Sequence, residues 1–308
     1  MRLRVPFAAF GATLKPVNAS PTEFRIPLRD GITLRALEWS SGVGTPILLI
    51  HGLASNARLW DGPARHLVSH GHSVIAIDLR GHGQSDKTDH GYAMSDIALD
   101  VADVLQFLAE RDVTFVRPLV IGQSWGGNIV IEVAHRHAHL VRGVVAVDGG
   151  TIELGVAFPE WNDCAEVMSP PPLIGMKATR LRSYMQAAHP DWSEEALDGQ
   201  MHNMEIIADG TIRPWLTLDR HLMVLRGLWE HAPSTLWSAI RVPVMFTPAA
   251  KSNDDFTQRK REQLRIAAES LAQVRVEWFE PADHDLHAQF PERFAHLIHD
   301  AITSEFFA

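Results

Sequence analysis

The chain has 308 residues, of which 46% are hydrophobic and 21% charged, so general disorder is excluded and one large domain with a packed core is expected. The formal net charge of -9 argues against nucleic acid or an anionic membrane as the main partner. The single cysteine, Cys164, excludes an internal disulfide framework and favours a reducing compartment.

The first residues share some features with a signal peptide, because Arg2 and Arg4 precede an apolar stretch at residues 5–14. Pro6 and Gly11 interrupt that stretch and no convincing cleavage site follows it, so secretion is not expected. No other apolar stretch approaches the roughly 20 residues that a membrane-spanning helix needs. We therefore expect a cytoplasmic protein.

The predicted elements begin with a hairpin, in which residues 24–28 and 32–39 flank an Asp30-Gly31 turn. Four short apolar runs follow, at residues 46–50, 73–77, 119–121 and 143–147. Such runs are typical of strands buried on both faces of a parallel sheet. Residues 95–110 have helical periodicity and lie between the second and third runs.

Beyond residue 240, strands are predicted at residues 244–246 and 274–279. A charged helix around residues 257–271 separates them, and its cluster at residues 259–261 (RKR) is interpreted as a solvated face. Residues 290–306 form a closing amphipathic helix. A hairpin followed by repeated strand–helix units predicts an α/β fold with a doubly wound, mostly parallel sheet.

Residues 151–240 interrupt this alternation. They contain no good strand candidate, but helical stretches, three consecutive prolines and the tryptophans Trp161, Trp192, Trp215, Trp229 and Trp237. We predict a helical cap inserted between two parts of the core, residues 1–150 and 241–308. Most of the tryptophans are expected to form the cap's own small core.

Residues 122–126 (GQSWG) follow an apolar strand and open onto a predicted helix. A G-x-S-x-G turn in this context holds its serine above the sheet at a helix N-terminus, which predicts Ser124 as a nucleophile. A hydroxyl needs a base, and in a strand-elbow hydrolase the histidine comes late in the chain. His284 follows the last strand and is the predicted base, with His287 as the alternative.

The oxyanion formed in acyl transfer needs two N–H donors. The backbone N–H of Trp125, directly after the serine, is one prediction. The N–H of Leu53 is the other, because it follows the first parallel strand beside Gly52, where backbone approaches substrate closely.

Four motifs together resemble, in order and spacing, the α/β-hydrolase fold superfamily: residues 51–53 (HGL), 78–85 (DLRGHGQS), 122–127 (GQSWGG) and 284–292. They look most like its capped esterase and carbon–carbon hydrolase branches. The resemblance implies a serine–histidine–acid hydrolase that needs no cofactor and no metal. It also implies that the loop containing His82 is structural.

The acid departs from the family pattern. Similar proteins place an aspartate after the strand equivalent to residues 244–247, but here Pro248 and Ala249 occupy that position. Some relatives use the end of the preceding strand, where this chain has Asp148. We favour Asp148 as the acid, with Asp254 or Asp255 as alternatives.

The predicted function is cleavage of small to medium, apolar carboxylic esters, with His51, Gly52, Phe158, Trp161 and Trp215 as substrate-binding residues. The alternatives are a carbon–carbon hydrolase of vinylogous diketones, a lactonase, a perhydrolase and a slow-turnover ligand receptor. A carbon–carbon hydrolase would need cationic cap groups for a substrate carboxylate, for which the candidates are Arg180, Arg182 and Arg213. The expected partner is a small-molecule substrate, and the protein is expected to be a monomer or homodimer.

Overall fold

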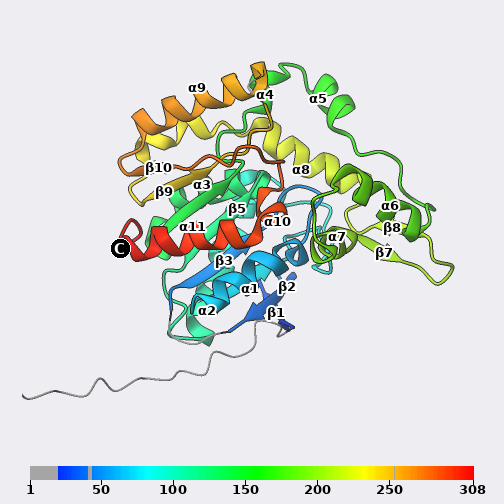
Figure 1. Ribbon diagram of the computed structural model, residues 1–308, viewed down its shortest axis with the longest axis horizontal. Helices are drawn as coiled ribbons and strands as arrows, with labels where there is room; N and C mark the ends of the chain where they lie inside the picture. Colours follow the sequence, from blue (N-terminus) through cyan, green and yellow to red (C-terminus); the bar gives the residue numbers. More distant parts are fainter. Residues whose placement is uncertain (1–19, 41–43, 253) are drawn as a thin grey trace, which may run out of the picture.

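A computed structural model describes residues 20–40, 44–252 and 254–308, so the apolar stretch at residues 5–14 lies outside the described part (Figure 1). Its main sheet has eight strands in the order β1-β2-β4-β3-β5-β6-β9-β10. The hairpin strands β1 and β2 are antiparallel, β2 is antiparallel to β4, and every later pairing is parallel. The predicted doubly wound, mostly parallel sheet is confirmed. The strands are β1 (Thr22–Pro27), β2 (Thr33–Trp39), β3 (Pro46–Ile50), β4 (Ser73–Ile77), β5 (Leu119–Gln123), β6 (Gly143–Val147), β9 (Val244–Thr247) and β10 (Val274–Val276).

Helices cover both faces of this sheet, which explains why β3, β5, β6 and β9 are mainly apolar and are buried along their whole length (Figure 1). One face packs against α1 (Asp61–Ser69) and α11 (Pro291–Thr303). The other packs against α2 (Met94–Arg111), α3 (Trp125–Arg136) and α9 (Asp255–Ser270). In the described part of the chain, no helix combines the length and apolarity required to cross a bilayer.

The last strand is shorter than the predicted residues 274–279. β10 ends at Val276, and an isolated bridge between Ala249 and Phe279 follows it. The backbone N–H of Phe279 donates to Pro248, so residues 277–279 still follow β9 although they leave the regular ladder. This bend brings the segment before His284 over the end of β9.

Five helices lie between β6 and β9, as Figure 1 shows at the side of the sheet: α4 (Leu154–Ala157), α5 (Trp161–Met168), α6 (Ala178–Ala188), α7 (Glu194–Met201) and α8 (Leu218–Glu230). The expectation that this region holds no strand is wrong. β7 (Met204–Ile206) and β8 (Ile212–Pro214) form a small antiparallel hairpin. Its turn is stabilised by Gly210, with φ +79°, and by Asp209, which accepts from the N–H of Thr211. Strands of three residues are too short to show an alternating pattern.

The tryptophans of this region do not share one core. Trp237 is buried in the main core beside α3, and Trp192 packs against Leu59 and Ala288 of the sheet domain. The predicted private core is therefore wrong for these two residues. Trp161 and Trp229 do meet each other, edge to face with ring centroids 5.9 Å apart.

Both stems of the inserted region are bound to α3 by buried polar side chains. Asn128 Oδ1 accepts from the N–H of Gly150 at 2.8 Å, and its Nδ2 donates to the carbonyl of Ile152 at 2.7 Å. The same amide lies 3.1 Å from His231 Nδ1, where the chain leaves α8. His231 Nε2 lies 3.1 Å from the carboxylate of Glu132. One helix thus holds the entry and the exit of the cap.

A second attachment lies at the short 3-10 helix η1 (Ala57–Trp60). Asn56, just before it, donates from Nδ2 to the carbonyl of Gly199 at 3.0 Å and also bonds the side chain of Asn203. Gly199 packs so closely that a Cβ there would lie 2.7 Å from the carbonyl oxygen of Arg58. The core and α7 therefore meet backbone to backbone.

Candidate active site

Ser124 occupies a strained turn between β5 and α3. Its φ of 55° and ψ of -117° are unfavourable for a residue with a Cβ. Tight glycine packing maintains this conformation: a Cβ at Gly122 would lie 2.0 Å from the carbonyl oxygen of Gly126, and one at Gly149 would lie 2.2 Å from that of Ser124. The side chain of Ser124 is partly exposed at the carboxyl edge of the sheet. The geometry of a nucleophile elbow is thus present.

The two predicted oxyanion donors lie next to this serine. Trp125 is the first residue of α3, where a backbone N–H has no acceptor within its own helix. Gly52 lies against the elbow, because a Cβ there would be 2.4 Å from Gln123 Oε1 and 3.1 Å from Ser124 Cβ. Leu53, the next residue, is partly exposed. The loop after β3 and the start of α3 therefore both border the hydroxyl.

His51 was predicted to bind substrate, and the structure contradicts this. Its ring is 1% exposed, with Nδ1 2.7 Å from the carbonyl of Gly52 and Nε2 accepting from the N–H of Leu79 at 3.0 Å. Both ring nitrogens are used by backbone, and burial lowers the pKa of His51, so the neutral ring supports the loop from beneath. The preceding strand β3 is buried too, which leaves no face of His51 for a ligand.

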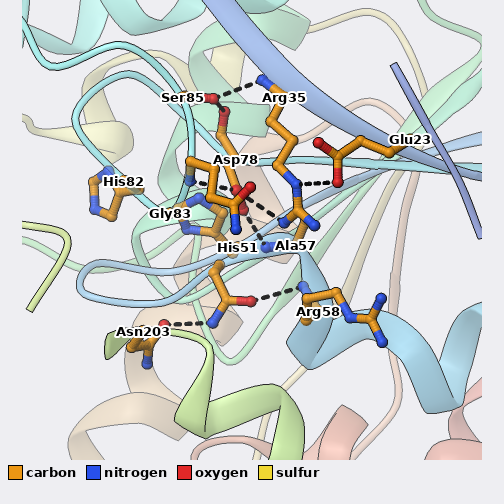
Figure 2. A network of polar contacts seen from close by, with 12 residues as sticks. Glu23, Arg35, His51, Ala57, Arg58, Asp78, His82, Gly83, Ser85 and Asn203 are labelled. Atoms are coloured by element: carbon orange, nitrogen blue, oxygen red, sulfur yellow. Dashed lines mark hydrogen bonds and ion pairs between the residues drawn. The ribbon is translucent and has the colours of Figure 1, made fainter. Parts of the chain in front are cut away.

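The support continues into the loop after β4, as Figure 2 shows around Asp78. Asp78 is fully buried; it accepts from the N–H of Ala57 at 2.7 Å and from that of Gln84 at 2.9 Å. Ser85 Oγ donates to the Asp78 carbonyl. His82, also fully buried, stacks on Trp125 with ring centroids 5.3 Å apart. The motif at residues 78–85 thus packs beneath the loop that follows β3.

His284 and Asp148 form a direct pair. His284 Nδ1 lies 2.6 Å from Asp148 Oδ2, and the carboxylate is 5% exposed while the imidazole is 53% exposed. Asp148 follows β6, the strand that pairs with β5, and Gln123 Nε2 donates to the backbone carbonyl of His284 at 3.4 Å. The structure therefore brings Ser124, His284 and Asp148 to one edge of the sheet.

The alternative acids lie elsewhere. Asp254 is the N-cap of α9 and accepts from the N–H of Thr257 at 2.8 Å. Asp255 is exposed in the first turn of the same helix. Both side chains lie at the N-terminus of α9, whereas Asp148 contacts His284.

Charge interactions favour an ion pair at this site. Desolvation opposes the imidazolium, but the hydrogen bond and the charge of Asp148 outweigh it and raise the pKa of His284 above its ordinary value. Desolvation would likewise raise the pKa of Asp148, yet His284 and Lys260 hold it below the usual range. Asp285, next in the chain, has a pKa raised by burial.

Two contacts at the acid were missed by sequence reasoning. The backbone N–H of Ala249 donates to Asp148 Oδ1 at 2.9 Å, and Lys260 Nζ lies 2.6 Å from the same oxygen. Lys260 was interpreted as part of a solvated face, which is wrong, because its side chain is only 14% exposed. A helical-wheel argument could have placed Lys260 with Leu264 and Ala267 on the inner side of α9.

The predicted cap residues are spread over two places. Trp161 lines a cavity of about 450 Å³ together with Tyr92, Met223 and Arg226, and none of the three catalytic candidates belongs to its walls. Phe158 lies nearby, since its carbonyl accepts from Trp229 Nε1. Trp215 is half-buried elsewhere, with the ammonium of Lys87 5.7 Å from its ring centre. Lys87 also donates to the carbonyl of His82. Among the predicted cap residues, Trp215 therefore lies beside the loop that contains His82.

Curated relatives match part of this chain. A 2-(acetamidomethylene)succinate hydrolase of Mesorhizobium japonicum is 36% identical over 38% of this chain and 39% of its own length. A non-heme haloperoxidase of Rhodococcus erythropolis is 39% identical over 35% of this chain and 37% of its own length. These matches span less than half of the curated relatives.

Among solved structures, an E-2-(acetamidomethylene)succinate hydrolase superposes with a TM-score of 0.76 at 24% identity, covering 92% of this chain and 99% of its own. A thioesterase domain from the curacin biosynthetic pathway gives a TM-score of 0.73 at 20% identity, covering 91% and 99%. At such identities these likenesses show the fold. The family model of the alpha/beta hydrolase family matches residues 47–297, and the chain therefore belongs to this family.

Proposed function

We propose that this protein is a serine hydrolase that cleaves small to medium, largely apolar carboxylic esters through an acyl-enzyme intermediate. The observation that carries the proposal is the 2.6 Å contact between His284 and Asp148 at the sheet edge that also holds the strained Ser124. A buried carboxylate that orients an imidazole beside an elbow serine is the arrangement that activates a hydroxyl.

In the proposed reaction, His284 Nε2 removes the proton from Ser124 Oγ as this oxygen attacks the ester carbonyl. The N–H groups of Leu53 and Trp125 stabilise the resulting oxyanion, at about 3–4 kcal/mol for each donor. His284 then protonates the departing alkoxide, and the acyl group stays on Ser124. A water molecule deprotonated by His284 releases the acid, while Asp148 stabilises the imidazolium in both steps.

The arginines weighed for a carbon–carbon hydrolase do not favour that reaction. Arg182 pairs with Glu194 and Asp198, and Arg213 pairs with Glu205 on the exposed cap surface. Arg180 is exposed and donates to the hydroxyl of Tyr184. With these partners, the three side chains offer no obvious site for a substrate carboxylate, which supports an apolar ester instead.

A perhydrolase is the second candidate, favoured by the relatives named non-heme haloperoxidases. In that reaction hydrogen peroxide replaces water as the group that attacks the acyl-enzyme, so the product is a peracid and Ser124 is regenerated. Monochlorodimedone bromination in the presence of acetate, bromide and peroxide would detect the peracid. Ester hydrolysis measured without peroxide reports the hydrolase activity alone, so the two assays separate the activities.

A fluorophosphonate probe tests the proposed nucleophile. We expect it to modify Ser124, as detected by mass spectrometry of the folded protein, and the Ser124→Ala variant to lose both labelling and turnover of p-nitrophenyl esters. A chain-length series of these esters would then define the acyl pocket. An unmodified Ser124 in a protein that hydrolyses the esters would contradict the proposal.

The acid is tested in the same assay with two matched variants. Asp148→Asn should lower kcat by about 10³–10⁴-fold, because the imidazole loses its orienting carboxylate. Asp254→Asn should leave kcat unchanged, since its side chain caps α9. The reverse result would move the acid to α9.

A further inference from the structure

The two oxygens of Asp148 have different partners. Oδ2 faces His284, whereas Oδ1 accepts from the backbone N–H of Ala249 at 2.9 Å and from Lys260 Nζ at 2.6 Å. The carboxylate therefore bridges the histidine, which must be neutral to act as the base, and a lysine on a different element. Residues 148 and 260 are far apart in sequence, so the fold creates this pair.

Lys260 also holds the loop to which the acid is anchored. It extends from α9 and donates a second hydrogen bond, at 2.8 Å, to the carbonyl of Ala249. Its side chain is 14% exposed and that of Asp148 is 5% exposed. Exposed ion pairs contribute little, but a pair this buried contributes more to local electrostatics, because solvent screens it weakly. Lys260 thus connects the end of β6 with the loop after β9.

The lysine changes the charge balance of the pair in the resting enzyme. Burying a carboxylate without a counter-charge costs free energy, and His284 supplies no counter-charge when its ring is neutral. Lys260 is among the groups that hold the pKa of Asp148 below its usual range despite burial. Its ammonium also disfavours protonated His284, against the stronger opposite effect of Asp148.

We propose that Lys260 is a positioning residue for the reaction: it keeps Asp148 anionic with Oδ2 directed at His284, and it limits how strongly the pair retains a proton before substrate arrives. This inference rests on the proposed serine-hydrolase function. In the family pattern the acid follows the strand equivalent to β9. In this chain the backbone N–H of Ala249, which lies at that place, and Lys260 of α9 bind an acid that follows β6.

The other titratable groups around the pair act in known directions. Asp285 favours the imidazolium, and His189 lies close enough to influence Asp285. His287 is fully buried, and desolvation lowers its pKa to about 3, so it stays neutral. Lys251 pairs with Asp283 rather than with the acid. Within the described ranges, Lys260 is thus the cation that contacts Asp148.

The test compares the pH dependence of Ser124 labelling and of kcat/KM in variants of the full chain. In Lys260→Met the imidazolium loses a repulsive neighbour, so His284 remains protonated to higher pH. We expect the acidic limb of both profiles to move upward by about 0.5–1 pH unit, and kcat to fall roughly tenfold as the carboxylate loses a donor. Lys260→Arg keeps the charge and should retain the acidic limb of the parent protein.

Arg259→Met is the matched control, because it removes an exposed cation from the same helix and should leave both profiles unchanged. Lys260→Gln is the second neutral variant, should the methionine variant fail to fold. An acidic limb that is identical in the parent and the neutral variants would overturn the inference. An acidic limb shifted as far in Lys260→Arg as in Lys260→Met would also overturn it. Failure of the parent protein to label at Ser124 at any pH would instead refute the proposed function.

Discussion

The conformation of Ser124 depends on residues that have no side chain. Gly122 and Gly126 belong to the recognisable motif, but Gly149 comes from the loop after β6 and lies against the carbonyl of Ser124. A Cβ at Gly149 would also lie 3.1 Å from the Cα of Gly127. The strained serine is thus enclosed by backbone from two loops, which leaves it no room to relax.

Gly149→Ala should therefore disturb the elbow more than the fold. We expect kcat/KM to fall at least about tenfold and the free energy of unfolding to fall by about 1–3 kcal/mol, because the new methyl group forces backbone shifts. Steady-state kinetics and urea denaturation would measure both. Gly31→Ala is the control: its φ of +87° makes alanine strained, but the space around it is open and far from the site in the hairpin turn. Equal kinetic effects in the two variants would refute this account.

Residue positions could be predicted from the sequence where a motif defines the backbone. Ser124 and His284 are such cases, since a turn and a chain order locate them; their catalytic roles stay predictions. Asp148 stayed one of several acids, because local sequence does not show that the residue after β6 contacts a histidine 136 positions later. Lys260 was missed because the run of three cations was interpreted as one solvated face, although helical spacing places Lys260 on the side of Leu264 and Ala267. His51 was misassigned, since its place after a predicted strand does not show that the side chain is buried and bonded to backbone.

At the scale of elements, α1 and α11 meet through a group of histidines. His72, at the start of β4, lies 3.1 Å from His299 through Nε2 and Nδ1, and His70 stacks on His299 with ring centroids 4.4 Å apart. Burial, together with the neighbouring histidines, lowers the pKa of His72 to about 4. His296 adds a further ring 5.9 Å from His70. This packing therefore favours neutral imidazoles at His70 and His72.

The interface should weaken in acid. An unfolded chain protonates His72 near its ordinary pKa of about 6.5, whereas the folded state does so only near 4, so the folded state binds fewer protons between these values. Stability present above pH 6.5 is lost as the pH falls, by about 2 kcal/mol at pH 5 for this one group. Chemical denaturation at pH 5 and 7 should show a smaller difference for His72→Gln than for the parent. His135→Gln, exposed on α3, should behave like the parent; identical pH dependence in all three would contradict the prediction.

The elements themselves could be predicted where burial is continuous. Strands β3, β5, β6 and β9 are buried over their whole length and mainly apolar, and α2 shows clear periodicity. The small hairpin β7–β8 was not predicted, because its form depends on one turn and on packing with α6 through a bridge between Lys177 and Thr211. Local patterns thus define elements that bury a full face and leave out those that do not.

For the whole molecule, the seam between cap and core is the feature that local patterns describe least. Asn56 joins the loop after β3 to α7. Gly227 of α8 packs on Tyr92, because a Cβ at Gly227 would lie 2.2 Å from the Tyr92 carbonyl oxygen. Residues 151–240 were predicted as an insertion because they break the strand–helix alternation. Their attachments could not be predicted, since the contacts of Asn56 with Gly199 and of Tyr92 with Gly227 join residues more than 100 positions apart.

Asn56→Ala should loosen this seam. It leaves the carbonyl of Gly199 and the side chain of Asn203 without their donor, at a cost of about 1–3 kcal/mol for buried groups. We expect a lower melting temperature and faster proteolytic cleavage within residues 194–214, with KM raised more than kcat is lowered. Arg182→Ala, which removes exposed ion pairs within the cap, is the matched control and should change these values little. Unaltered proteolysis in the Asn56 variant would count against a structural seam at this point.

Asn128 gives the attachment of the inserted region a further consequence. A single amide on α3, the helix that begins after Ser124, binds Gly150, Ile152 and His231, the flanks between which some eighty residues depart and return. These bonds hold both flanks against the same helix, so the two junctions stay at a fixed distance from each other. They are natural splice points, at which an engineer could exchange the inserted region for another while keeping the sheet and its edge.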